Sequence, residues 1–185
     1  MRRARRPRGH AAEALVGGAL LGGLAGIAAT AAMTVAMRRL WRGLPASERY
    51  PLPPREITER LVGDRLPGRR SEATLRHATV AAHFGFGAAT GALFPLLSTA
   101  RSPGAGAAYG VAVWAASYFG WVPGLRILAP ASAHPARRNA LMIAAHLVWG
   151  AAVAGLLGEF ERAERDAFSS GRLRDAPRSR IGCRP

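Results

Sequence analysis

Two histidines, His83 and His146, are the side chains best suited to chemistry inside the long apolar stretches of this chain. An imidazole changes its charge near neutral pH, binds metals and relays protons. If both faced the interior of one helical bundle, they could share a ligand or pass a proton. Alternatively, each imidazole hydrogen-bonds a neighbouring carbonyl or hydroxyl group and holds helices together. The sequence leaves both interpretations open, and Trp149, on the same stretch as His146, belongs to this candidate site.

The remaining polar residues support no recognised catalytic arrangement. No carboxylate lies in the core of an apolar stretch, because Glu13 and Glu159 stand only at the edges. Two histidines are too few for a typical zinc site. The sequence contains no nucleophile elbow, no phosphate-binding glycine loop and no His-Glu-x-x-His motif. We therefore expect no catalytic residues, no metal, no cofactor and no enzyme activity.

Four apolar stretches set the predicted fold, and none of them carries an arginine until its edge. They are Glu13–Met37, Ala78–Ala100, Gly104–Ile127 and Asn139–Gly158. A bilayer core requires about 20 predominantly apolar residues per helix. Soluble core helices of this length usually have one polar face. The sequence therefore predicts an all-α, polytopic integral membrane protein with four transmembrane helices.

The spans divide the chain into three parts. Residues 1–12 form a basic N-terminal tail, residues 13–158 the transmembrane domain, and residues 159–185 a polar tail whose distal part we expect to be disordered.

In the first connection, Pro53, Pro54 and Arg55 begin a segment with paired charges and an apolar stripe up to about Leu66. This pattern predicts a short amphipathic helix at the headgroup level. An ordinary solvated helix is the alternative.

Glycines in the first stretch predict close helix packing. Gly18, Gly22 and Gly26 are four residues apart and share one helix face. Small residues at this spacing let two helix backbones approach each other in lipid. We expect packing within the bundle, and dimerisation through the first helix is the alternative.

The charge of the chain indicates its partner. The formal net charge is +15, and all 26 basic residues are arginine. In a soluble protein this excess would suggest nucleic-acid binding. Beside membrane spans it favours anionic lipid headgroups, at about 1 kcal/mol per arginine near the surface. We therefore expect a bilayer with anionic headgroups as partner, and no nucleic acid; a homo- or hetero-oligomer remains open.

Four spans would place both termini on the same side of the membrane. The arginines near the spans do not choose the side, since 13 fall on each. We expect the inner membrane of a bacterium, with both termini cytoplasmic, following the usual arrangement of small bacterial membrane proteins.

Three short motifs carry a resemblance to a known family. They are Pro51-Leu52-Pro53-Pro54-Arg55, Ala82-His83-Phe84-Gly85-Phe86-Gly87 and Ala145-His146-Leu147-Val148-Trp149-Gly150. Together they resemble the YagU-type small inner-membrane proteins, a family of largely unknown function. The resemblance implies a membrane bundle and a link to acid-stress tolerance, and it points to the two histidines and the Pro-Pro-Arg segment.

The predicted function is that of an integral membrane protein of unknown molecular function, with envelope or acid-stress physiology as the expected setting. One alternative is a structural or assembly partner of another membrane protein. A second is a small channel or carrier with a pH-sensitive histidine pair, and a third is a soluble basic nucleic-acid binder.

Overall fold

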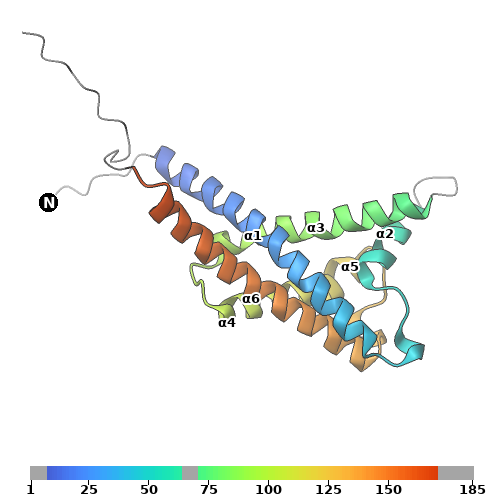
Figure 1. Cartoon of the computed structure of the whole chain (residues 1–185). Coiled ribbons are helices and arrows are strands. Elements are labelled where there is room, and N and C mark those ends of the chain that lie inside the picture. Colours follow the sequence, from blue (N-terminus) through green and yellow to red (C-terminus); the bar gives the residue numbers. More distant parts are fainter. Residues whose placement is uncertain (1–7, 64–70, 171–185) are drawn as a thin grey trace, which may run out of the picture.

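The structure is a computed structural model that describes residues 8–63 and 71–170, and within these residues it contains helices and no strand (Figure 1). The three long helices are α1 (Arg8–Arg42), α3 (Glu72–Leu97) and α6 (Ala136–Ala167). The shorter elements are η1 (Ala46–Glu48), α2 (Pro53–Gly63), α4 (Pro103–Ala115), η2 (Ala116–Trp121), α5 (Val122–Gly124) and η3 (Ala131–Ala133).

Three helices are long and apolar enough to cross a membrane. The qualifying segments are Ala12–Arg42, Glu72–Leu97 and Ala136–Ala167. The helical, membrane-type pattern is thus confirmed in coarse terms, but the predicted number of four such helices is wrong. α1 and α6 extend at both ends beyond the apolar stretches from which they were predicted, since helical hydrogen bonding continues into the charged flanks. α3 begins earlier than predicted, at Glu72, but ends at Leu97, before the predicted Ala100.

The expected third span, Gly104–Ile127, is a broken helix. Regular α-helix ends at Ala115, a π-helical segment follows, and Gly120 inside it has non-helical angles of φ −108° and ψ −106°. The last piece, α5, contains Pro123, which cannot donate a backbone hydrogen bond. Arg126 then adopts a positive φ of 56°, and the helix does not resume.

The broken helix nevertheless connects the two ends of the molecule. At one end, Arg101 precedes α4 and pairs with Glu161 near the end of α6, with 2.9 Å between Nη2 and Oε1. At the other end, Asn139 in the first turns of α6 donates from Nδ2 to the carbonyl oxygen of Ala131 in η3. The start of α1 and the end of α6 lie at the same end of the molecule (Figure 1).

Glycines permit two close helix crossings. A Cβ atom at Gly22 of α1 would lie 2.5 Å from the carbonyl oxygen of Gly91 of α3, and the converse distance is also 2.5 Å. One turn further, a Cβ atom at Gly26 would overlap the backbone of Gly87. A Cβ atom at Gly18 would meet only Pro95, at 3.8 Å, which is an ordinary contact. The crossing of α1 and α3 is thus centred on two of the three predicted glycines.

The second crossing joins α4 to α6. A Cβ atom at Gly106 would overlap the carbonyl group of Gly150, and one at Gly110 would overlap the carbonyl oxygen of His146. Backbone approach of this kind is available only to residues without a side chain.

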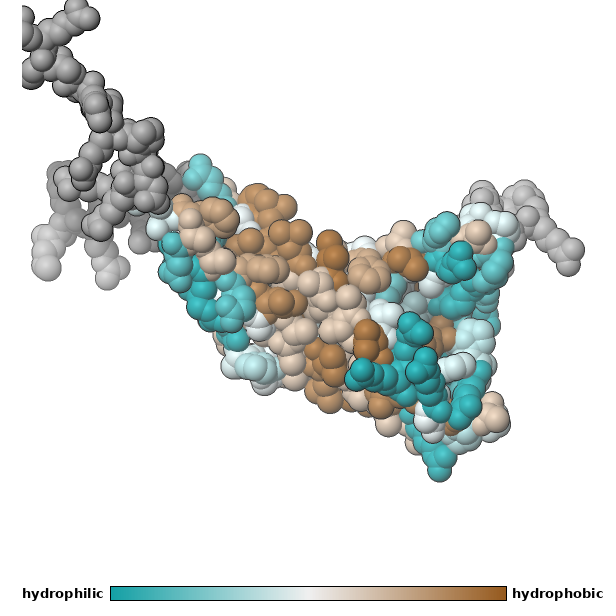
Figure 2. Space-filling model, viewed as in Figure 1, coloured by the Kyte–Doolittle hydropathy of each residue, from teal (hydrophilic) through white to brown (hydrophobic). Residues whose placement is uncertain are grey.

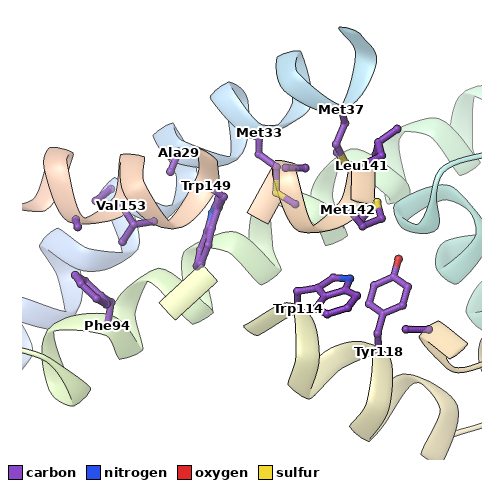
Figure 3. Packing of buried hydrophobic residues seen from close by; sticks show 14 of the residues in the cluster. Ala29, Met33, Met37, Phe94, Trp114, Tyr118, Leu141, Met142, Trp149 and Val153 are labelled. Atoms are coloured by element: carbon purple, nitrogen blue, oxygen red, sulfur yellow. The ribbon is translucent and has the colours of Figure 1, made fainter. Parts of the chain in front are cut away.

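Large side chains fill the space between the crossings. Met33 and Met37 of α1 lie over Leu141 and Met142 of α6, and Trp149 lies further along the same helix (Figure 3). Phe94 of α3, Trp114 and Tyr118 belong to the same buried cluster.

The outer surface separates by polarity. Figure 2 shows hydrophobic residues across the middle of the visible face, with hydrophilic residues concentrated at the two ends. Many large apolar side chains are exposed, among them Leu20, Leu24, Val35, Val80, Leu93 and Leu97. An exposed apolar belt between two polar ends is the pattern of a surface that faces lipid.

Candidate functional site

The two predicted histidines line one cavity. Its volume is about 230 Å³, and its walls come from α1, α2, α3, the α4–η2–α5 segment and α6. His83 enters from α3 and His146 from α6. The structure thus brings together two side chains that lie far apart in the sequence, and Trp149 lines the same cavity.

The two glycine crossings fix where these histidines lie. His83 stands four residues before Gly87, and His146 stands four residues before Gly150. Because residues four apart share a helix face, each histidine lies one turn from the point where its helix touches a neighbour. The carbonyl group of His146 is itself part of the α4–α6 crossing, beside Gly110. Helix packing therefore turns both side chains toward the interior.

His146 is nearly buried, at 7% exposure, and its hydrogen bond defines its tautomer. The Nδ1 atom lies 2.7 Å from the carbonyl oxygen of Met142, one turn earlier on α6. A carbonyl oxygen only accepts, so Nδ1 carries the proton and donates. The neutral ring then has a hydrogen-bond acceptor at Nε2. This bond stays within one helix, so it does not join two helices as the alternative interpretation required.

His83 and Tyr118 carry polar atoms that are unsatisfied. The Nε2 atom of His83 and the hydroxyl group of Tyr118 are buried, and neither has a hydrogen-bond partner in the part of the chain that the structure describes. Both residues line the cavity. Buried polar groups in proteins are nearly always hydrogen-bonded, so each exception calls for an explanation such as strain, a functional role or a bound water. Glu48 Oε2 and Trp114 Nε1 are unsatisfied as well, but their residues do not line the cavity. The unsatisfied atoms of His83 and Tyr118 are therefore the strongest chemical signal of the site.

Tryptophans and hydroxyl residues form the rest of the polar lining. Trp149 donates from Nε1 to Oγ1 of Thr30 at 3.2 Å, and Trp121 donates from Nε1 to Oγ of Ser117 at 3.2 Å. Both indole N–H groups are therefore occupied, and their rings contribute mainly apolar surface. The remaining lining is dominated by carbon, including Met33, Phe86 and Met142. The cavity is apolar with a few convergent polar groups, as small-molecule sites usually are.

The predicted amphipathic helix covers one side of the cavity. α2 begins at Pro53, and Pro53, Pro54 and Thr58 line the cavity. Arg55 points elsewhere: it donates to Glu59 at 2.5 Å and to Glu72 of α3 at 2.8 and 2.9 Å. Hydrogen bonds to Glu72 and then to Glu59 raise the pKa of the Arg55 guanidinium above its ordinary value. Arg55 thus ties the helix to α3, while the prolines contact the cavity.

Sequence reasoning missed two features of this region. One is Tyr118, whose segment was predicted to be a continuous helix; it lies in η2, is buried and lines the cavity. The other is Arg138, which is only 5% exposed and donates to the carbonyl oxygens of Glu48, Tyr50 and Pro51 at 2.9–3.1 Å. Its guanidinium carbon lies 3.5 Å from the centre of the Tyr50 ring. No sequence signal separates it from the exposed Arg137 beside it.

The described residues contain no group of three or more His, Cys, Asp and Glu side chains that could hold a metal ion. The cavity lining itself is mostly apolar, with a few neutral polar groups that can form hydrogen bonds. Polar atoms available for this are His83 Nε2, the Tyr118 hydroxyl and His146 Nε2.

Comparison of the chain with protein-family models, curated proteins and solved structures finds no match. The resemblance to the YagU-type proteins stays a prediction from short motifs.

Proposed function

We propose that this chain is a multi-pass membrane protein that holds a small, mainly apolar molecule in the cavity beneath α2. In this arrangement α1, α3 and α6 cross the bilayer, and the broken helix from Pro103 to Gly124 returns the chain between them. The exposed apolar belt and the polar ends support the membrane arrangement.

The observation that carries the proposal is the size and lining of the cavity. An apolar cavity of about 150 Å³ accommodates benzene, so one of 230 Å³ suits a molecule of about nine non-hydrogen atoms. Trp149, Trp121 and Phe86 offer flat apolar walls to such a molecule. A single ring with one or two polar substituents fits these dimensions.

The polar atoms define the substituent. Tyr118 donates or accepts through its hydroxyl group, and the neutral His146 ring accepts at Nε2. His83 Nε2 does either, depending on its tautomer. A hydroxyl group on the ligand can donate to one of these atoms and accept from another, which satisfies groups that the protein leaves unpaired. The ligand class is therefore an aromatic or cyclic alcohol. A cyclic ketone is the next class that would fit.

The test uses a matched pair of probes, p-fluorophenol and p-fluorotoluene, which differ by a hydroxyl and a methyl group of similar size. Purified protein in lipid nanodiscs is titrated with each probe, and binding is followed by fluorine NMR. The proposal expects saturable binding of the phenol at least about fivefold tighter than that of the toluene, since a buried polar group left unsatisfied costs about 1–3 kcal/mol.

Two variants locate the binding. Val113→Phe adds a ring inside the cavity, whereas Val80→Phe adds the same ring on the exposed face of α3. Loss of saturable binding in the first variant and its retention in the second support the proposal. Equal binding by the two variants, or equal binding of the two probes by the natural protein, would contradict it.

The cavity also bears on the alternative functions. Two histidines around one cavity favour a small carrier over an assembly partner. The assembly alternative relied on the glycine face of the first helix, but Gly22 and Gly26 are already occupied by α3. A wash of the membranes with carbonate and high salt tests the remaining alternative. A membrane carrier or assembly partner should stay in the membrane fraction, whereas a soluble nucleic-acid binder should be released. A role in acid-stress physiology stays a prediction.

A further inference from the structure

A second cavity lies on the outside of the bundle, where α1 ends and the chain turns toward α2. It measures about 360 Å³ and is lined by Arg38, Trp41, Arg42, Pro51, Leu52 and Arg55. It shares no lining residue with the cavity of the proposed function. Its walls combine guanidinium groups with an indole and two apolar side chains.

Two positive charges in this cavity are uncompensated. Arg55 is neutralised by Glu59 and Glu72. Arg38 and Arg42 form no ion pair with any acidic residue in the described part of the chain, and both are exposed. They are four residues apart and share one face of α1. Two guanidinium groups at this spacing suit the oxygen atoms of one phosphate group, which arginine binds through paired hydrogen bonds.

The position of the cavity along α1 indicates a lipid as the source of the phosphate. Arg38 is the first charged residue after the apolar part of the helix, so it stands where headgroups begin. Trp41 is fixed there, because its Nε1 donates to the carbonyl oxygen of Tyr50 at 3.3 Å. Tryptophan is enriched at this level of membrane proteins.

An apolar track leads directly to the arginine pair. Leu20, Leu24, Ile27 and Val35 are all exposed, at 66%, 56%, 42% and 50%. In chain order these residues are four, three and eight positions apart, and Arg38 and Arg42 follow at three and four more. This helical spacing places all six on one face of α1. An acyl chain lying on this track would bring its phosphate group to the two guanidinium groups.

We propose that Arg38, Arg42 and Trp41 form a binding site for the phosphate headgroup of an anionic phospholipid, whose acyl chain lies along the exposed face of α1. A lipid with a net negative charge is preferred over a zwitterionic one, because the site contributes two positive charges and no carboxylate to meet an ammonium group. The site is independent of the proposed ligand cavity.

Native mass spectrometry of the full-length protein in detergent tests this site. Phosphatidylglycerol and phosphatidylethanolamine with the same acyl chains are added in turn, with inorganic phosphate as a competitor. The paired variant Arg38→Gln with Arg42→Gln is compared with Arg76→Gln with Arg137→Gln, which removes the same charge from exposed positions at the same end of the molecule.

The expected result is retention of phosphatidylglycerol by the natural protein and by the control pair, with an affinity about 30-fold lower in the Arg38 and Arg42 pair. Both arginines are exposed, so the melting temperature should not change, and each single substitution should give an intermediate affinity. Equal loss in the control pair would show a general charge effect and overturn the site. Equal retention of the two lipids, or displacement of the lipid by equimolar inorganic phosphate, would overturn it as well.

Discussion

The indole Nε1 of Trp149 on α6 donates a hydrogen bond of 3.2 Å to the hydroxyl Oγ1 of Thr30 on α1. The same hydroxyl group donates to the carbonyl oxygen of Gly26 at 2.7 Å. Thr30 also touches the α1–α3 crossing, because a Cβ atom at Gly87 would overlap its Oγ1. One threonine thus connects three helices at the edge of the ligand cavity.

Replacement of this hydroxyl should destabilise the bundle. Thr30→Val keeps the shape of the side chain but leaves the buried Trp149 N–H without an acceptor, at a cost of about 1–3 kcal/mol in the free energy of unfolding. Denaturant titration of the purified protein, followed by tryptophan fluorescence, measures this cost. Thr34→Val is the matched control, because the Thr34 hydroxyl bonds only to the carbonyl oxygen of Thr30 within α1. Equal effects of the two substitutions would contradict the bridging role of Thr30.

Glycines on α6 should differ sharply in their tolerance of a methyl group. A Cβ atom at Gly150 would overlap the backbone of Gly106, so Gly150→Ala must separate α4 from α6 and should cost about 3 kcal/mol or more. A Cβ atom at Gly155 meets nothing within 4 Å, so Gly155→Ala should be neutral or stabilising by up to about 1 kcal/mol. Thermal unfolding of the two variants in one detergent makes the comparison. Similar melting temperatures would show that the α4–α6 crossing is looser than described.

The sequence predicted the helical class because hydropathy depends on local composition, and for the same reason it could name His83 and His146 as candidates. It could not predict the break at Gly120. Gly110 and Gly120 stand in the same apolar stretch, yet a Cβ atom at Gly110 would overlap the carbonyl oxygen of His146, whereas one at Gly120 meets nothing within 4 Å. Only tertiary contacts distinguish a glycine that packs from one that breaks a helix.

The site was predicted in part for a related reason. Whether His83 and His146 face each other depends on how each helix is rotated, and that rotation is fixed by the crossings at Gly87 and Gly150. Tyr118 lies in the π-helical segment, where it is buried and lines the cavity. These are properties of the packed bundle and not of any one stretch of residues.

Arg138 should hold the connection between α1 and α2 in place. Arg138→Gln replaces the guanidinium group, which donates to three carbonyl oxygens and stacks on Tyr50, with a shorter amide that cannot make all of these contacts; the loss should cost about 2–3 kcal/mol. Hydrogen–deuterium exchange gives the local readout, and amides of residues 44–52 should exchange faster. Arg137→Gln removes the same charge from the exposed neighbour and should leave that exchange unchanged. Faster exchange throughout the chain in Arg138→Gln would instead indicate general destabilisation.

The arrangement of the helices across the membrane predicts which loops share a side. Single cysteines are introduced at the exposed positions Ser47, Ser102 and Ser132 in a Cys183→Ser background. Ser47 and Ser132 lie at one end of the bundle, in η1 and just before α6, whereas Ser102 lies at the other end beside the Arg101–Glu161 pair.

In intact cells, a membrane-impermeant thiol reagent should therefore either label both Ser47→Cys and Ser132→Cys or leave both unlabelled. Ser102→Cys should give the opposite result. Labelling after cell lysis controls for accessibility of each thiol. If Ser102→Cys is labelled together with Ser47→Cys, α3 does not cross the membrane and the proposed arrangement fails. If Ser132→Cys instead follows Ser102→Cys, the broken helix does not return the chain, and the cavity walls contributed by η2 and α6 could not meet as described.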